Sequence, residues 1–393
     1  MPEAFVISSV RTAIGAFGGS LSGIAPGELA ASVAREAIRR ASVPAEAIDS
    51  SVFGQVIPTE PADAYLARVA ALNAGVSVGA PALTINRLCG SGLQAVIHAA
   101  QSILLGDSDV CIAGGAESMS RAPYLMPKAR FGARLGDTEL VDYLAGALTD
   151  PFNRYHMGVT AENVAEKCEI TRAMQDDLAY ESHRRAANAI RTGRFKHQIL
   201  PIQRMVRGNP VTFDTDEHVR MNASRGDFDA LRPAFKNPGG TVTAGNASGI
   251  NDGAACLVLA SQAAVKKYSL KPVARVVAYA NTGLDPAIMG MGPVSATRLV
   301  LRKAGLELHD VDVIEANEAF AAQACAVART LDLDPMRVNP NGSGIALGHP
   351  IGATGAILAV KLIAELQRVG ARYGLATMCI GGGQGVAVIL ESV

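Results

Sequence analysis

The sequence predicts an α/β fold made of two similar halves with a long insertion, and three observations lead to this prediction. Short β-branched runs such as residues 4–7 and 110–113 alternate with helical stretches such as 26–41 and 93–105, a pattern typical of buried, mostly parallel strands. The C-terminal stretch GHPIGATGAILAVKLIAELQRVGARYGLATMCIGGG repeats the plan of CGSGLQAVIHAAQSILLGDSDVCIAGG, which indicates a duplication. Between them, residues 121–246 are richer in proline, charge and loop signals, as expected for an insertion folded over a site.

Each half is expected to contain one helix that is buried inside the protein. Helix 93–105 is apolar nearly all round, so it should have no face to solvent. The matching helix near the C-terminus, 356–369, would pack beside it at a pseudo-twofold centre. The insertion contains one charged helix, 172–192, in which acidic residues precede a basic cluster, so we expect the cluster to be a solvated helix face. The cluster comprises His183, Arg184, Arg185, Arg191, Arg194 and Lys196.

Charge and composition exclude several classes of protein. Lysine plus arginine total 36 and aspartate plus glutamate total 36, so no net charge draws the chain to nucleic acid or to an anionic membrane. No signal sequence precedes the first strand, and no uninterrupted apolar run reaches the ~18 residues of a membrane span. We therefore expect a soluble cytoplasmic protein. The histidines form no H-E-x-x-H motif and the cysteines no C-x-x-C pair, which argues against a metal site and a disulfide scaffold. The cysteines are Cys89, Cys111, Cys168, Cys256, Cys325 and Cys379.

Cys89 is the first candidate for chemistry. It follows a probable strand and is expected at the first turn of helix 93–105, where free backbone N–H groups and the helix dipole favour a thiolate. The glycines at 90 and 92 would let a substrate carbonyl approach and leave N–H groups free to bind it. The alternative is a buried structural cysteine beside a tight turn.

Three further residues lie at similar positions. His349 stands in the glycine-rich loop NPNGSGIALGHPIGATG and could be the base for a cysteine, or a turn histidine bonded to backbone. Cys379 ends a strand before GGGQG; because residues 386–390 look like a strand, this run does not match a dinucleotide-binding loop. Asn317, followed by Glu318, stands at a strand-to-helix junction, where an N-cap is the alternative role. All four residues fall at strand ends or loops of the duplicated core, where such sheets bind ligands.

These residues belong to seven motifs, NRLCGSGLQA, GGAESMSRAPY, HMGVTAENVA, TVTAGNASGINDGAA, EANEAFAAQACAV, NGSGIALGHPIGATGA and MCIGGGQGVA. In this order and over the whole chain, the sequence resembles the thiolase family, most closely its bacterial acetyl-CoA acetyltransferase or β-ketothiolase branch. The resemblance implies a five-layered αβαβα core. It assigns 1–120 plus 247–271 to an N-terminal half, 121–246 to an inserted loop domain for CoA binding and tetramerisation, and 272–393 to a C-terminal half. It also implies a homotetramer, a dimer of dimers.

The resemblance implies a reversible Claisen condensation of two acyl-CoA molecules to a 3-ketoacyl-CoA and CoA, as used in fatty acid metabolism and polyhydroxyalkanoate biosynthesis. Cys89 would become acylated while His349 accepts its proton. Cys379 would remove the α-proton of the second acyl-CoA. His349 and a water held by Asn317 would form one oxyanion hole, and the backbone N–H groups of Cys89 and Gly381 the other. Coenzyme A would be substrate or product, with no tightly bound cofactor.

By the same resemblance, a partly apolar tunnel binds the CoA moiety. Arg220 has an alternative role as a surface salt-bridge residue. The histidine loop reads VNPNGSGIALGHP, a form that also occurs in β-ketothiolases accepting longer chains, so acetoacetyl-CoA and longer ketoacyl-CoA substrates are both expected. The tunnel residues are Leu148, His156, Met157, Arg220, Ala234, Phe235, Ala244, Ser248 and Met289.

Three other functions were weighed against this one. A decarboxylating ketoacyl synthase would use one cysteine and two histidines, and Cys379 and the N-E-A-F motif disfavour it. A non-catalytic acyl-CoA-binding relative should lack one of Cys89, His349 or Cys379, and all three are present. An NAD-dependent oxidoreductase needs a dinucleotide loop that opens a helix, and the sequence has none.

Overall fold

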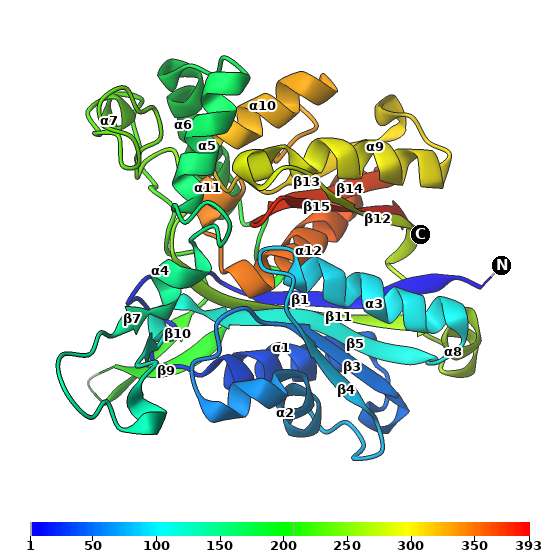
Figure 1. The fold of residues 1–393 in the computed structure, drawn as a ribbon. Helices are drawn as coiled ribbons and strands as arrows, with labels where there is room; N and C mark the ends of the chain where they lie inside the picture. Colours follow the sequence, from blue (N-terminus) through cyan, green and yellow to red (C-terminus); the bar gives the residue numbers. More distant parts are fainter. Residues whose placement is uncertain (1, 207) are drawn as a thin grey trace.

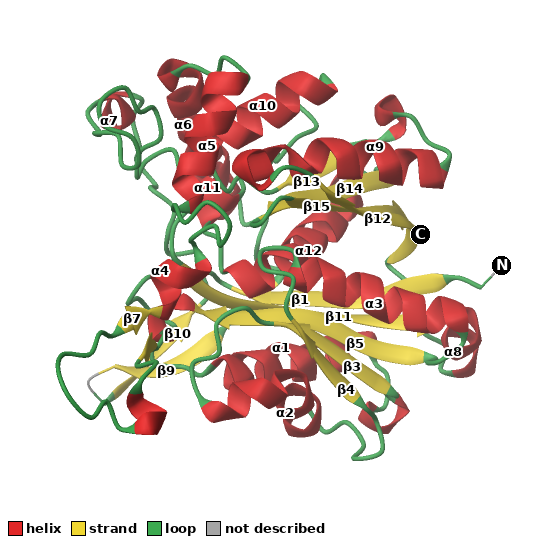
Figure 2. Ribbon diagram, in the orientation of Figure 1, coloured by secondary structure: helices red, strands yellow, loops and turns green. Residues whose placement is uncertain are grey.

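The chain is arranged in five layers. The structure is a computed structural model that describes residues 2–206 and 208–393. Figure 1 and Figure 2 show two layers of strands with a pair of helices between them and further helices on both outer sides. The αβαβα order predicted from the sequence is thus confirmed.

The strands of the two layers form one hydrogen-bonded path, β13-β14-β15-β12-β1-β11-β5-β3-β4. The halves join where Phe5 pairs with Arg275 and Val6 with Ala274. The first layer contains β1 (Ala4–Thr12), β3 (Ser50–Gly54), β4 (Ala82–Ile85), β5 (Val110–Ser118) and β11 (Asn251–Ser261), with β2 (Gly15–Ala16) beside β11 and β8 (Ile199–Leu200) beside β1. The second contains β12 (Ala274–Gly283), β13 (Val313–Ala316), β14 (Tyr373–Ile380) and β15 (Gln384–Ser392).

The two layers repeat one topology. Outward from the junction, β1, β11 and β5 pair antiparallel, and β5, β3 and β4 pair parallel. In the second layer β12, β15 and β14 pair antiparallel, and β14 and β13 pair parallel. A parallel bridge between Ile314 and Val338 takes the place of the fifth strand. The duplication predicted from the sequence is therefore present strand by strand.

The middle layer consists of α3 (Ser91–Leu105) and α12 (Ile351–Val369), which pack on each other and on both layers of strands. Both predicted buried helices exist, but α12 begins at Ile351 rather than at 356. The glycines that suggested a loop are inside the helix because they lie at its contact with α3. A Cβ atom at Gly355 would overlap the backbone of Leu93, and one at Gly92 would lie 2.7 Å from the nitrogen of Ala356.

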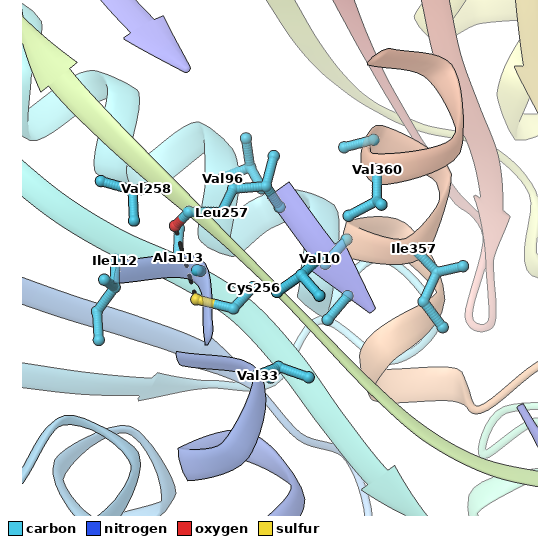
Figure 3. Packing of buried hydrophobic residues seen from close by; sticks show 14 of the residues in the cluster. Val10, Val33, Val96, Ile112, Ala113, Cys256, Leu257, Val258, Ile357 and Val360 are labelled. Atoms are coloured by element: carbon cyan, nitrogen blue, oxygen red, sulfur yellow. Dashed lines mark hydrogen bonds between the residues drawn. The ribbon is translucent and has the colours of Figure 1, made fainter. Parts of the chain in front are cut away.

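The composition of α3 follows from this burial. Within residues 2–206 and 208–393, the segment Leu88–Leu105 is the one stretch long and apolar enough to cross a membrane, and 56% of it is buried inside the protein. Figure 3 shows the surroundings of this helix: Val96 of α3, Val10 of β1, and Ile357 and Val360 of α12 belong to one cluster of buried apolar side chains. A helix enclosed between two sheets needs an apolar surface on every side.

Outer helices cover the far faces of both sheets (Figure 1). On the first sheet these are α1 (Pro26–Ala41), whose bounds match the prediction, and α2 (Leu66–Asn73); α8 (Gln262–Lys267) follows β11. On the second they are α9 (Gly292–Ala304) and α10 (Ala321–Leu331). The short α11 (Gly344–Leu347) leads into α12.

The segment between β5 and β11 contains the predicted charged helix, α6, which packs with α5 on α10. The interpretation of its basic cluster as a solvated face was wrong for His183, which is buried and accepts a hydrogen bond from the backbone N–H of Arg220 at 3.1 Å. The elements of this segment are β6 (Tyr124–Leu125), β7 (Val141–Asp142), α4 (Tyr143–Ala147), α5 (Met157–Lys167), α6 (Arg172–Arg191), β9 (Ile202–Val206), β10 (Asn209–Phe213) and α7 (Gly226–Asp229).

Candidate active site

Cys89 lies between β4 and α3, two residues before the helix, rather than in its first turn as predicted; Gly90 is the N-cap. The residue before it, Leu88, has a φ of 47°. A leucine in the left-handed region is strained, and such strain is retained where neighbouring groups impose it, often at functional sites. Here the Leu88 N–H donates to Oδ1 of Asn86 at 2.9 Å, and its carbonyl accepts from Oγ of Ser91 at 2.6 Å. The turn that presents Cys89 is therefore fixed on both sides.

The thiol of Cys89 faces two backbone donors. Burial raises its pKa, the N–H groups of Gly381 and of Cys89 itself lower it, and the charge of Glu117 raises it. The two N–H groups come from different halves of the duplication. Because they are directed at the sulfur, they also lie where the oxygen of a carbonyl attacked by that sulfur would develop negative charge.

His349 is held in one tautomer by its neighbours. Its Nδ1 is 2.6 Å from Oγ1 of Thr354, and that hydroxyl donates its proton to the carbonyl of Pro350 at 2.9 Å. The hydroxyl must therefore accept from Nδ1–H, which leaves Nε2 with a free lone pair. Burial lowers the pKa of His349 to about 4, so the ring is neutral near pH 7. The ring is thus prepared to accept a proton at Nε2.

Asn317 follows β13, and its Nδ2 lies 3.5 Å from Nε2 of His349. Its Oδ1 is buried and has no partner among the residues that the structure describes. Its backbone N–H donates to Thr377 of β14 at 3.0 Å. The alternative role as an N-cap is wrong, because α10 begins at Ala321 after Phe320. A buried amide with a free acceptor next to the histidine is the arrangement that could hold a water or a substrate group.

Cys379 is the next-to-last residue of β14 and is buried. Burial raises its pKa, and the charge of Cys89 raises it further, so the two sulfurs are close enough to interact. Gly381 follows the strand, and a Cβ atom there would lie 3.1 Å from the methyl carbon of Met157. The structure thus places Gly381 and Cys379 of the second half beside Cys89 of the first, and Asn317 beside His349.

Five of the predicted tunnel residues adjoin this centre. Met157 and Met289 belong to the apolar cluster that contains Cys379. Leu148 packs on the cluster beside Cys89, which contains Val56, Ile57, Met119, Leu144 and Ile351. The rings of His156 and Phe235 stack at 4.7 Å with an interplanar angle of 12°. Burial lowers the pKa of His156, and its Nδ1 accepts from the N–H of Gly158 at 3.0 Å.

The remaining four lie elsewhere on the segment between β5 and β11. The N–H of Ser248 donates to the carbonyl of Ala319 at 2.9 Å, which ties it to the loop after β13. Ala234 and Ala244 are exposed. The guanidinium of Arg220 lies over the ring of Phe228, 5.5 Å from its centroid, rather than in the surface salt bridge weighed as an alternative. Their part in CoA binding stays a prediction.

The structure also contains functional candidates that sequence reasoning missed. Thr354 fixes the tautomer of His349, and Glu117 lies close enough to Cys89 to act on its pKa. The cue for Thr354 was its place one turn into the helix that follows the histidine. The signal for Glu117 was a charged residue near the end of a buried apolar strand. Among the described residues, no group of three or more His, Cys, Asp or Glu side chains is arranged to bind a metal ion.

Models of known protein families match nearly the whole chain. Residues 4–263 match the thiolase N-terminal domain model, and residues 270–392 match the thiolase C-terminal domain model. The chain belongs to the thiolase family. Thiolases are acyltransferases, so the family, the fold and the enzyme class predicted from the sequence are confirmed.

Three relatives place it within the thiolases. The β-ketothiolase BktB of Cupriavidus necator is 62% identical over 391 residues, covering 100% of this chain and 99% of its own. The structure of the acetyl-CoA acetyltransferase of Bacillus anthracis is 46% identical, with a TM-score of 0.97 and coverage of 100% and 99%. Human mitochondrial 3-ketoacyl-CoA thiolase in complex with CoA is 44% identical, with a TM-score of 0.96 and coverage of 100% and 98%.

Proposed function

We propose that this thiolase cleaves 3-ketoacyl-CoA with CoA and catalyses the reverse condensation of two acyl-CoA molecules, through an acyl-enzyme on Cys89. One observation carries the proposal: the thiol of Cys89 faces the N–H groups of Gly381 and Cys89, in a centre that also holds a neutral His349 with a free Nε2. Nucleophile, base and oxyanion donors are the three parts that acyl transfer needs.

In the first half-reaction of condensation, the Cys89 sulfur attacks the thioester carbonyl while Nε2 of His349 takes the thiol proton. The carbonyl electron pair moves to oxygen, and the N–H groups of Cys89 and Gly381 stabilise that oxyanion. When the tetrahedral intermediate collapses, the carbon–sulfur bond to CoA breaks and the protonated His349 returns its proton to the leaving thiolate. The products are the acyl-enzyme and free CoA.

In the second half-reaction, Cys379 removes the α-proton of a second acyl-CoA. The Cys379 thiolate takes this proton, so that a Cys379 thiol and an enolate form, and the enolate carbon attacks the acyl carbonyl on Cys89. The carbon–sulfur bond to Cys89 then breaks, which gives the 3-ketoacyl-CoA and the Cys89 thiolate, and the thiol of Cys379 returns the proton to Cys89. Asn317 would bind the enolate oxygen through a water on its free Oδ1, and His349 could donate to this oxygen from Nε2 only in its protonated form. The raised pKa of Cys379 matches this role, because a thiolate with a high pKa is a stronger base.

The substrates are acyl-CoA compounds, and we extend them from acetoacetyl-CoA to longer ketoacyl chains. The identity with the β-ketothiolase BktB supports the longer chains. The CoA complex of the human thiolase supports CoA itself as ligand. Next to Cys89, the apolar cluster that includes Val56, Leu144 and Ile351 offers aliphatic contacts to an acyl chain.

We further propose that the chain forms a homotetramer. The segment from β6 to β7 exposes a run of large apolar side chains, among them Phe131 at 83% and Leu135 at 99% exposure. Exposed apolar patches on a folded chain mark contact surfaces. Other large apolar side chains of this segment are exposed as well, namely Tyr124, Leu125, Met126, Leu140 and Val141.

The test is CoA-dependent loss of ketoacyl-CoA absorbance with acetoacetyl-CoA and 3-ketohexanoyl-CoA. Wild type should cleave at least the first, and Cys89→Ala should cleave neither. Cys168→Ala is the matched control, because Cys168 is also a half-buried thiol but lies at the end of α5. Binding of both compounds by wild type without cleavage would favour a non-catalytic acyl-CoA-binding protein instead.

A further inference from the structure

Glu117 lies near the end of β5, beside the active centre. The two halves can be matched at the start of this strand, because Asp49 donates its N–H to the carbonyl of Val110 in the first half and Asp312 donates its N–H to that of Tyr373 in the second. Counted from this match, Cys379 corresponds to Ala116, and Glu117 corresponds to Ile380. The duplication therefore places a buried carboxyl group one residue past the position at which the other half has its acid–base thiol.

The carboxyl group of Glu117 is enclosed by backbone donors. Its side chain is fully buried. Oε2 accepts from the N–H groups of Val56 at 3.0 Å and Gly352 at 2.8 Å, and Oε1 accepts from Ile57 at 3.1 Å. Because both oxygens accept, these contacts favour the carboxylate. The N–H of Gly352 is one of the free donors in the first turn of α12, where a negative charge is stabilising.

These bonds connect the two sides of the active centre. Gly352 follows His349 by three residues. A Cβ atom on it would overlap Glu117 and lie 2.9 Å from Cα of Gln55, so a glycine lets the end of α12 approach. On the other side, Val56 and Ile57 pack in the apolar cluster against Cys89. One side chain thus ties the helix that follows the base to the loop beside the nucleophile.

We propose that Glu117 is a positioning residue of the thiolase reaction, which holds the first turn of α12, and with it His349, in register with Cys89. This inference rests on the function proposed above. It assigns to the first half of the duplication a structural carboxylate next to the position that the second half uses for proton transfer.

The charge of Glu117 has a second effect, which makes the role measurable. It raises the pKa of Cys89. Burial raises the pKa of Glu117 itself to about 8, opposed by its three N–H bonds, and Asp63 raises it further. The other titratable groups of the centre are His349 and Cys379. Loss of the charge should make Cys89 easier to ionise, while loss of the contacts should slow proton transfer to His349. A residue that only supports the fold would not make Cys89 easier to ionise and at the same time slow proton transfer to His349.

Two substitutions separate the effects. Glu117→Gln keeps the volume but turns an NH2 group toward backbone donors and removes the charge. Glu117→Asp keeps the charge but is too short for all three bonds. The control is Asp63→Asn, since Asp63 is a buried acid of the same half that accepts from Thr59 and Glu60 and not from α12.

The experiment measures acetoacetyl-CoA cleavage at pH 8.5 and the pH profile of Cys89 alkylation by iodoacetamide, read by mass spectrometry. We expect both Glu117 variants to lose roughly 10- to 100-fold in kcat with KM within about twofold. The alkylation midpoint should move to lower pH in Glu117→Gln and stay in place in Glu117→Asp. Asp63→Asn should leave kcat at pH 8.5 within about twofold of wild type.

Two results would overturn the inference while leaving the proposed function intact: wild-type kcat in both Glu117 variants, or an unmoved alkylation midpoint in Glu117→Gln. If Glu117→Gln does not fold, as judged by circular dichroism, the kcat of Glu117→Asp alone tests the positioning role. A wild-type enzyme that cleaves no ketoacyl-CoA would instead remove the proposed function, and the inference with it.

Discussion

Replacement of Thr354 by valine tests how the catalytic histidine is held. Thr354 is 3% exposed and His349 is 5% exposed, and the substitution keeps the shape of the side chain while removing its oxygen. Nδ1–H of His349 then loses its acceptor in a buried site. Leaving such a donor unpaired costs about 1–3 kcal/mol. The ring can avoid the cost by moving its proton to Nε2, but Nε2 then no longer accepts the proton of Cys89.

Either response slows the reaction. A penalty of about 1–3 kcal/mol in the transition state corresponds to a roughly 5- to 150-fold fall in kcat. The assay is acetoacetyl-CoA cleavage at saturating CoA, and KM should change little because the substitution leaves the tunnel intact. Thr354→Ser keeps the hydroxyl and should stay within about twofold of wild type.

The matched control is Thr297→Val in α9. Thr297 is also fully buried, and its Oγ1 has no partner in the part of the chain that the structure describes. Its replacement should leave kcat unchanged, since no hydrogen bond is lost. Wild-type turnover in Thr354→Val would refute the tautomer that we derive from the two hydrogen bonds of this hydroxyl.

Further outcomes follow from the same geometry. Cys379→Ala should abolish turnover but leave Cys89 open to acylation by acetyl-CoA, as detected by intact mass; loss of acylation would contradict separate roles for the thiols. Lys361→Met leaves Glu315, whose pKa burial raises to about 7, without its 2.6 Å partner, and should lower the free energy of unfolding by about 3–5 kcal/mol at pH 8. Because Lys361 lowers the pKa of Glu315, its loss raises that pKa further above the unfolded value, so stability should return as the pH falls and Glu315 becomes protonated in urea titrations; a pH-independent loss would count against it. Because burial lowers the pKa of His349 to about 4, the acid limb of kcat/KM should lie near that pH, and a limb near 6.5 would argue for an exposed histidine.

Local patterns in the sequence were sufficient to predict the features that depend on short segments. The apolar surface of residues 93–105 identified a buried helix, and the echo near the C-terminus identified the duplication. The small-residue loops placed Cys89, His349 and Cys379 in loops or at strand ends. Each of these signals comes from periodicity or from residues within about one turn of each other.

Features that depend on pairs far apart in the sequence could not be predicted. Glu117 accepts a hydrogen bond from the N–H of Gly352, which lies 235 positions later in the sequence. The groups that stabilise its charge are backbone N–H groups, and the identity of a residue does not reveal such a role. Lys361 reaches Glu315 across 46 positions inside the core. The start of α12 was misjudged because its glycines serve helix packing, and glycine in isolation indicates a turn.

The order of the strands sets when the active centre can exist during synthesis. The first sheet needs β11, which is made after the long insertion, and the donor at Gly381 is made later still, between β14 and β15. Cys89 therefore leaves the ribosome long before the groups that direct its reactivity. A nascent chain that has not reached Gly381 carries Cys89 without this donor, and the nucleophile becomes competent only when β14 and the turn after it are in place.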